Sequence, residues 1–192
     1  MKFQSEPNTS AGEFFELLEN SGYRWPAKLE GTANQNGFTV PQGTTVLAFH
    51  FKDGVLVAGD RRATAGNSIM YEQCDKVIAI DDFTLMAIAG VPATAFEMAR
   101  VLSHNFEYYR RSQLQSMSIE GKIRALSKLL KENVGMAVQG LGVVSPIFAT
   151  YDPAGEKARI HFYDMLGADF QIRTHTATGS GSQIIRGILE HE

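Results

Sequence analysis

Four residues in the middle of the chain could do chemistry together. Thr44 carries a hydroxyl group and directly follows Gly43. Asp60 follows the apolar run VLVAG, and Lys76 precedes the apolar run VIAI. Because a carboxylate or an ammonium beside a buried strand is costly to desolvate, each is expected to have a partner. Gly90 is expected to close a strand. Each residue also has a purely structural interpretation, as a capped strand end, half of a buried ion pair, or a turn glycine.

Other reactive side chains form weaker patterns. The single cysteine, Cys74, is interpreted as a buried structural thiol. The five histidines lack the spacing of metal ligands, so no metal site and no cofactor are predicted. The run GSGS at residues 179–182 precedes a helical pattern but lacks the lysine of a phosphate-binding loop. Asp81 and Asp82 fit a hairpin turn.

The first 43 residues differ in character from the rest. Apolar side chains between Phe14 and Leu18 predict one short amphipathic helix with Ser10 as its N-cap. Residues 20–43 are rich in Asn, Gly and Pro, with little apolar periodicity. We interpret this part as a loosely ordered extension that leans on something larger, whereas composition alone favours an ordinary disordered tail.

From Thr44 onward the chain alternates between strand and helix patterns. The runs TTVLAFHF and VLVAGD flank Lys52-Asp53-Gly54, a strong hairpin signal. A second hairpin is predicted from Lys76–Ile80 and Phe83–Ala89. Further strands are predicted at Ile147–Tyr151, at Ala158–Asp164 and around Phe170–Ala177.

Apolar stripes predict the helices. The first stripe runs from Ala95 to Tyr109, and the second from Ile119 to Ala137 with Ser116 or Ser118 as its cap. A third helix is predicted after GSGS. This order of elements, with strands that are apolar on both faces, predicts an α+β fold. Two largely antiparallel sheets would lie between layers of helices.

Composition excludes several classes of protein. The net charge of −3 provides no basic surface for nucleic acid or an anionic membrane. No run approaches the roughly 20 apolar residues that span a bilayer, and the N-terminus has no signal-peptide pattern. One cysteine fits a reducing compartment. We therefore expect a cytoplasmic protein that binds neither nucleic acid nor membrane.

Taken together, these residues resemble a known family. The run QGTTVLAFHFKDGVLVAGDRRATAGN, the later Lys76, AIAGVPA and TGSGS are similar to proteasome β-type subunits, most closely to the actinobacterial type. The run GDRRAT after a TTV start is the most specific part. The resemblance implies a four-layer α/β/β/α Ntn-hydrolase sandwich. It also implies a propeptide at residues 1–43 and a peptidase domain at residues 44–192.

The resemblance implies activation by a cut between Gly43 and Thr44. Thr44 would then be a threonine-protease nucleophile, and its freed α-amino group would act as the general base. That amine titrates at about 7.7–8.0, so it can accept a proton near neutrality. Before the cut it is an amide and cannot act as a base. Gly43 fits the processing site because glycine tolerates a kinked backbone.

The remaining catalytic roles also follow from the resemblance. Lys76 would lie near the nucleophile and lower the pKa of the α-amino group, and Asp60 would hold that lysine. The backbone N–H of Gly90 would stabilise the oxyanion, and Ser180 would hydrogen-bond the amine of the nucleophilic threonine.

Substrate binding is implied in the same way. Main-chain groups of Thr64 and Gly90 would pair with an extended peptide. Five apolar positions would line the pocket for the side chain before the scissile bond, so cleavage after hydrophobic residues is expected. These positions are Ala63, Cys74, Ile78, Ile88 and Phe96.

The implied assembly is a heptameric β ring between α-subunit rings, fed with protein substrates by an ATPase unfoldase. The family continues after the GSGS helix and supplies an Asp and a second Ser there, so we expect this sequence, which stops at Glu192, to be a fragment. Two alternatives are a simpler bacterial ring protease that works with its own ATPase and a non-catalytic β subunit. GDRRAT argues against the first, and the presence of both Thr44 and Lys76 argues against the second.

Overall fold

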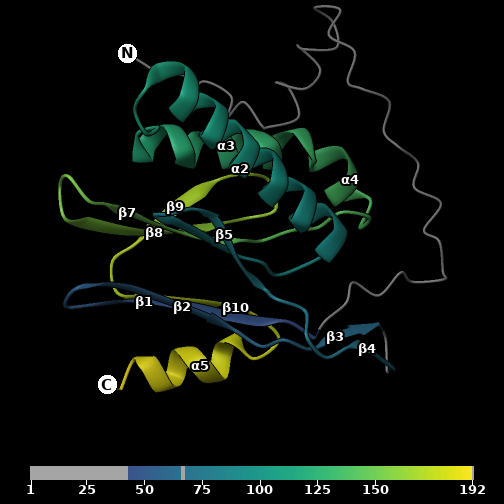
Figure 1. Ribbon diagram of the computed structural model, residues 1–192. Helices are drawn as coiled ribbons and strands as arrows, with labels where there is room; N and C mark the ends of the chain where they lie inside the picture. The colour runs from purple at the N-terminus through teal and green to yellow at the C-terminus, as the bar shows by residue number, and fades with distance from the viewer. Residues whose placement is uncertain (1–42, 66–67, 192) are drawn as a thin grey trace, which may run out of the picture. The chain divides into compact units, whose positions relative to one another are not determined.

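Two β-sheets lie face to face between layers of helices in the computed structural model, which describes residues 43–65 and 68–191 (Figure 1). Helices α2 and α3 cover the outer face of one sheet, and α5 covers the outer face of the other. The predicted four-layer sandwich of antiparallel sheets is confirmed. The helix predicted from Ser10 lies outside the described residues.

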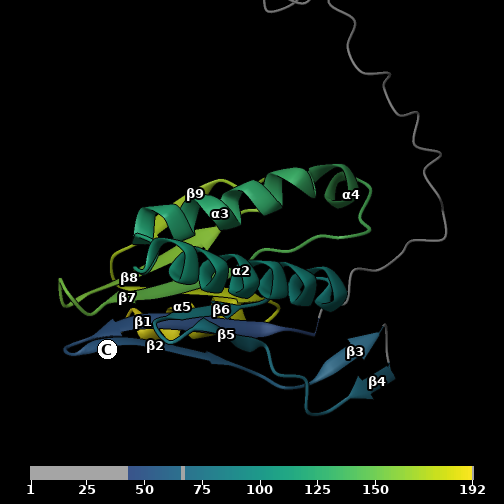
Figure 2. The ribbon, with the colours of Figure 1, turned by 45° about the horizontal axis from the view of Figure 1, so that its top comes forward.

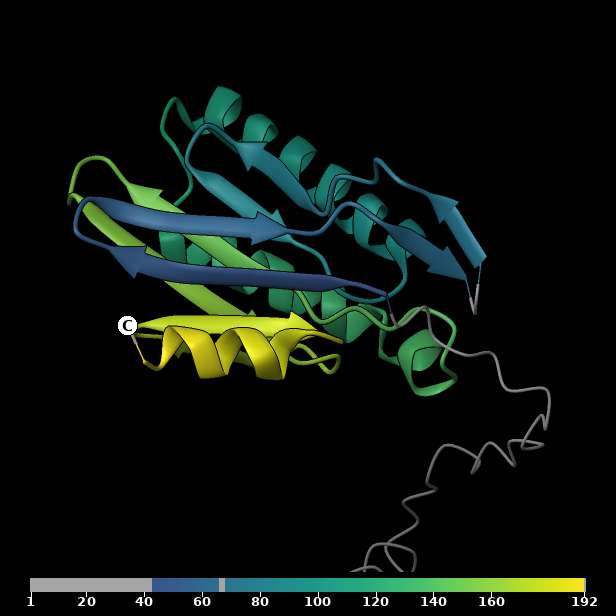
Figure 3. The ribbon, with the colours of Figure 1, turned by 90° about the horizontal axis from the view of Figure 1, so that it is seen from below.

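The smaller sheet carries the start of the predicted peptidase domain. Its order is β10 (His175–Gly179), β1 (Thr45–Phe51) and β2 (Gly54–Gly59), and every neighbour is antiparallel. The hairpin predicted at Lys52–Gly54 is confirmed. Seen from below, α5 (Ser182–Leu189) lies along β10 (Figure 3).

The larger sheet has five strands, each antiparallel to the next. They follow one another in sequence order, so the sheet is a meander that the helices interrupt after its second strand. The second predicted hairpin lies in it, and so do the strands predicted at Ile147–Tyr151 and Ala158–Asp164. Its strands are β5 (Val77–Asp81), β6 (Thr84–Ala87), β7 (Ile147–Asp152), β8 (Lys157–Tyr163) and β9 (Asp169–Ile172).

Two strand expectations differ from the structure. The single strand predicted around Phe170–Ala177 is wrong, because the chain leaves the larger sheet after β9 and enters the smaller one as β10. The exposed Arg173 and Thr174 make this crossing. The hairpin of β3 (Ala63–Ala65) and β4 (Ser68–Tyr71) was not predicted, since strands this short have no measurable alternation. Figure 2 shows this hairpin beyond the end of the large sheets.

The helices follow the apolar stripes with one break. Helices α2 (Pro92–Gln113) and α3 (Ile119–Glu132) match the two predicted stripes, and the Ser118 hydroxyl caps α3 by accepting from Gly121 N at 3.1 Å. The second stripe does not continue to Ala137, because α4 (Val134–Val138) is separate. At the break, the Asn133 side chain donates to Gly142 O at 2.6 Å. None of the described helices is long and apolar enough to cross a membrane.

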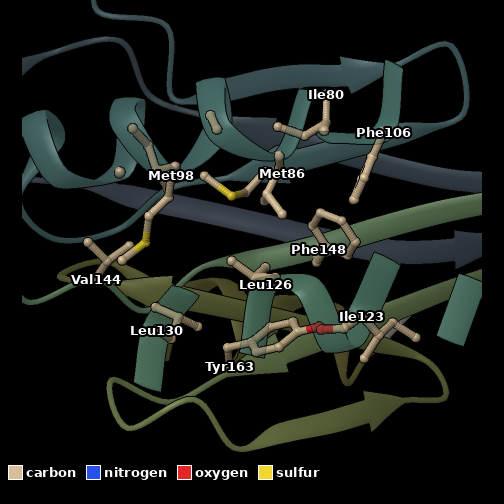
Figure 4. Close-up of a cluster of buried hydrophobic side chains, with 14 residues drawn as sticks. Ile80, Met86, Met98, Phe106, Ile123, Leu126, Leu130, Val144, Phe148 and Tyr163 are labelled. Carbon is tan, nitrogen blue, oxygen red and sulfur yellow. The ribbon is translucent and has the colours of Figure 1, made fainter. Parts of the chain in front are cut away.

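Two apolar clusters hold the layers together. In the first, Leu126 and Leu130 of α3 face Met86 and Phe148 of the larger sheet, with Phe106 of α2 beside them (Figure 4). The second lies between the sheets and includes Val46, Ala48, Ile147 and Ile160. Burial of each large apolar side chain contributes about 1.5–3 kcal/mol. Since Val46 is fully buried, the start of β1 has a fixed position next to Thr44.

Candidate active site

Lys76 and Asp60 meet where β2 ends and β5 begins. The Lys76 ammonium donates to Asp60 Oδ1 at 2.9 Å and to Oδ2 at 2.8 Å. The lysine side chain is 3% exposed and the aspartate side chain 37%, so the pair is closed on the lysine side and open to water on the other. The two charges that the sequence places beside buried strands therefore neutralise each other.

The same ammonium also reaches two backbone carbonyls. Lys76 Nζ lies 2.6 Å from Arg62 O and 3.2 Å from Gly43 O. An ammonium has three protons, so these acceptors share them with the carboxylate. The carbonyl of Gly43 belongs to the peptide bond that joins Gly43 to Thr44. A buried positive charge is thus directed at the bond predicted to be cut.

Three donors hold the Asp60 carboxylate. Besides Lys76, Thr45 N donates to Oδ1 at 2.7 Å and Arg62 N donates to Oδ2 at 3.1 Å. Burial raises the pKa of this carboxyl, but the hydrogen bonds from Lys76, Thr45 and Arg62, with the lysine charge, outweigh burial and hold the pKa below its usual value. Asp60 is therefore ionised at neutral pH and is a counter-charge for the Lys76 side chain.

The run TGSGS holds the other side of the nucleophile candidate. Ser180 N donates to Thr44 O at 2.9 Å, and Gly181 N donates to Thr45 Oγ1 at 3.0 Å. Gly179 has φ +97° and passes so close to Thr44 that a Cβ there would overlap Thr44 O. Ser180 therefore lies beside Thr44, and the contact between them runs through the main chain.

Gly90 lies at the end of the segment that follows β6. Its φ is +122°, and a Cβ would overlap Val143 O, so only glycine fits without strain. Val91 N donates to that same carbonyl at 2.8 Å, and Ile88 N donates to Lys76 O at 2.8 Å. The predicted oxyanion-binding segment is thus hydrogen-bonded to the main chain of Lys76.

Gly43 is packed against β3. A Cβ at this position would overlap the Oγ1 of Thr64 and lie 3.3 Å from its Cβ and 3.4 Å from its Cγ2. Both residues line a polar cavity of about 700 Å³, together with Thr45, Asp60, Arg61, Arg62 and Glu72. Gly43 of the predicted processing site, Asp60 and the predicted substrate-binding Thr64 therefore share one cavity.

A second cavity, of about 680 Å³, contains part of the predicted specificity pocket. Cys74, Ile78 and Phe96 line it, with Val77 and Ala99 among the other lining residues. Ala63 and Ile88 are not brought to this cavity. Ala63 starts β3, and Ile88 is 4% exposed in the cluster between the larger sheet and the helices. A larger cavity of about 790 Å³ lies at the β1–β2 and β7–β8 hairpins and contains none of the predicted site residues.

Sequence reasoning did not identify Thr45 and Arg62 as part of the site. Both act on Asp60 through backbone N–H groups, and Arg62 also accepts from Lys76 through its carbonyl. Residue type carries no signal for such contacts, although the doublet Thr44-Thr45 could have drawn attention to the second threonine. Within residues 43–65 and 68–191, no cluster of three His, Cys, Asp or Glu side chains could hold a metal ion.

Comparison with known proteins agrees with this geometry. The family profile described as "Proteasome subunit" matches residues 40–192. The chain is 40% identical over 165 residues to "Proteasome subunit beta" of Streptosporangium roseum, covering 86% of this chain and 58% of the relative. It is 41% identical over 151 residues to "Proteasome subunit beta 2" of Thermomonospora curvata, covering 79% and 54%. The chain thus spans little more than half the length of these relatives. By profile and sequence, it belongs to the proteasome subunit family as a β-type member.

Proposed function

We propose that the chain is the precursor of a threonine endopeptidase that cuts itself between Gly43 and Thr44 and then hydrolyses peptide bonds in unfolded proteins. One observation supports this proposal most. The buried Lys76 ammonium, neutralised by Asp60, donates to the carbonyl of Gly43. That carbonyl is the group that a nucleophile on Thr44 has to attack.

Self-cleavage needs only groups of the chain and one water molecule. The Thr44 hydroxyl oxygen adds to the Gly43 carbonyl carbon, the C–N bond breaks, and the hydroxyl proton ends on the departing nitrogen. Water then hydrolyses the resulting ester to a Gly43 carboxylate and a free Thr44 with its hydroxyl and α-amine. A donor to the developing oxyanion contributes about 2.7–4 kcal/mol in other hydrolases, and Lys76 is positioned for that role in the uncut chain.

Turnover uses the same hydroxyl on a substrate carbonyl. The new α-amine takes the hydroxyl proton as the general base, and the nearby Lys76 charge lowers the pKa of that amine. The N–H of Gly90 stabilises the oxyanion, and Ser180 orients the amine. The hydrogen bond from Ile88 N to Lys76 O, in the segment that leads to Gly90, supports the role of Gly90. The hydrogen bond from Ser180 N to Thr44 O supports the role of Ser180.

The apolar cavity supports cleavage after hydrophobic residues. Cys74, Ile78 and Phe96 line it, and we propose that they form the specificity pocket while the main chains of Thr64 and Gly90 pair with the peptide.

The names of the relatives describe proteasome subunits, which supports assembly with other subunits. We propose a heptameric β ring that stacks on α-subunit rings in the cytoplasm and receives substrates from an ATPase unfoldase.

A peptidase assay on the full chain, expressed with α-type subunits, tests the proposal. With a fluorogenic peptide that has an apolar residue before the scissile bond, Thr44→Ala should abolish hydrolysis, and Thr44→Ser should retain part of it. Lys76→Met should reduce kcat more than 100-fold, consistent with the loss of about 3 kcal/mol. Lys52→Met, at an exposed hairpin lysine, should leave kcat unchanged. Full activity in Thr44→Ala would refute the proposal.

A further inference from the structure

The contact between Gly43 and Thr64 leaves no room for a side chain at position 43. A Cβ there would overlap Thr64 Oγ1, and the Cβ and Cγ2 of Thr64 would lie only 3.3 and 3.4 Å away. Rotation of the threonine about χ1 moves Oγ1 but leaves the Cβ of Thr64 in place. Threonine is also stiff at χ1, because two heavy atoms branch from its Cβ. Relief therefore requires that one of the two residues move or lose atoms.

Neither backbone is free to move. Thr64 is in β3 and pairs with Ile69 of β4. Gly43 is held on another side by Lys76 Nζ, 3.2 Å from its carbonyl oxygen. The next residue along the chain, Thr44, accepts from Ser180 N at 2.9 Å. The peptide bond between Gly43 and Thr44 is thus held between the β3 hairpin, the Lys76 ammonium and the TGSGS turn.

We propose that Thr64 is a positioning residue for self-cleavage: its side chain admits only glycine before Thr44 and thereby keeps the Gly43 carbonyl on the Lys76 ammonium. This inference rests on the proposed function. It adds no group to the reaction, since the bond that breaks and the path of the proton are those of the self-cleavage described above. With Thr64 in its observed rotamer, a side chain at position 43 has to retreat from Thr64 Oγ1 by roughly 1 Å, and a displacement of that size can slow a positioned reaction by about 100-fold.

A double-mutant experiment tests the inference. The full chain is expressed with α-type subunits, and the rate of cutting after residue 43 is followed by intact mass. Gly43→Ala should slow cutting about 100-fold when Thr64 is present. In the Thr64→Ala background the same change should slow cutting less than about 10-fold, because only the 3.3 Å contact between the two Cβ positions remains.

Thr64→Val is the matched control. Valine keeps the shape of threonine and loses the hydroxyl. In that background Gly43→Ala should therefore still slow cutting after residue 43 by about 100-fold. Rescue by Thr64→Val would mean that the hydroxyl, rather than its bulk, matters, and would overturn the inference. An equal effect of Gly43→Ala in all three backgrounds, or no effect in any, would also overturn it. If the wild-type chain itself is never cut, the proposed function fails and this role of Thr64 fails with it.

A cross-link tests the contact even if a variant at position 43 folds poorly or is not cut. In a Thr44→Ala chain, which is expected to remain uncut, Gly43→Cys and Thr64→Cys together place two Cβ atoms about 3.3 Å apart. This separation is close to the 3.5–4.5 Å range of disulfides. Oxidation should remove two hydrogens from the intact mass and join the peptides that contain positions 43 and 64. Absence of that cross-link in folded protein would overturn the inference.

Discussion

Replacement of Asp60 by asparagine removes one negative charge and leaves the shape of the side chain unchanged. Each carboxylate oxygen accepts from one backbone N–H, Oδ1 from Thr45 and Oδ2 from Arg62, and both accept from Lys76. An amide has only one acceptor oxygen. Whichever way the Asp60→Asn amide turns, its NH₂ group faces a backbone N–H donor and the Lys76 ammonium. The lysine, 3% exposed, then loses its counter-charge.

The size of the effect follows from exposure. Removing one partner of a fully buried pair costs about 3–5 kcal/mol. Because the Asp60 side chain is 37% exposed, water screens part of the loss. We therefore expect Asp60→Asn to lower the free energy of unfolding by about 2 kcal/mol, near the value for a hydrogen bond to a charged group. For a domain of this size, that lowers Tm by about 4–8 °C.

Thermal unfolding of purified protein at pH 7 measures this effect. Asp75→Asn is the matched control, because Asp75 pairs with Arg61 at 2.9 Å but the two side chains are 72% and 58% exposed. Its loss should stay below about 1 kcal/mol. The pKa of Asp60 is held below its usual value, so the difference from wild type should persist down to pH 5 and shrink only below about pH 4, as the wild-type carboxyl protonates. A loss for Asp60→Asn no larger than that of the control would refute the buried-pair reasoning.

Three further predictions use other parts of the structure. Lys122→Met should lower the urea midpoint by an amount equivalent to about 2–3 kcal/mol, because the buried Lys122 donates to the 28%-exposed Asp81 at 2.6 Å; an unchanged midpoint would contradict this. Gly90→Ala should destabilise the chain by at least about 1–2 kcal/mol through its φ of +122° and the overlap with Val143 O, whereas Gly135→Ala, with nothing within 4 Å, should not. Burial lowers the pKa of His161 despite the neighbouring Asp169 carboxylate. As the pH falls, His161 therefore binds a proton in the unfolded chain at a higher pH than in the folded chain, so the free energy of unfolding should decrease below about pH 6.5. His161→Gln should flatten the slope of Tm against pH between about 6.5 and 5.

Much of the fold could be predicted because the relevant signals are local. The turn at Lys52–Gly54 and the apolar runs around it define the β1–β2 hairpin, and the Ser118 cap marks the start of α3. The division between β9 and β10 could not be predicted, because β9 pairs with its sequence neighbour β8, whereas β10 pairs with β1, which lies far away in the sequence. A run of suitable residues shows that a strand can form but not which sheet it joins.

Some contacts of the candidate site could likewise be predicted from the sequence, and others could not. The cost of burying Asp60 and Lys76 beside apolar strands predicts that both are paired, and the structure shows them paired with each other. The carbonyls of Gly43 and Arg62 on Lys76, and the N–H of Thr45 on Asp60, could not be predicted, since every residue type has these groups. The packing of Gly43 on Thr64 likewise needs the β3–β4 hairpin, which has no clear sequence signal.

The N-terminus of the protein recovered from assembled particles tests the central claim most directly. Intact mass and N-terminal sequencing should show a wild-type chain that begins at Thr44 and lacks residues 1–43, while Thr44→Ala keeps its full N-terminal extension. A different first residue in the wild-type chain, or a chain cut after Gly43 in Thr44→Ala, would contradict the assignment of Thr44 as the nucleophile of its own activation.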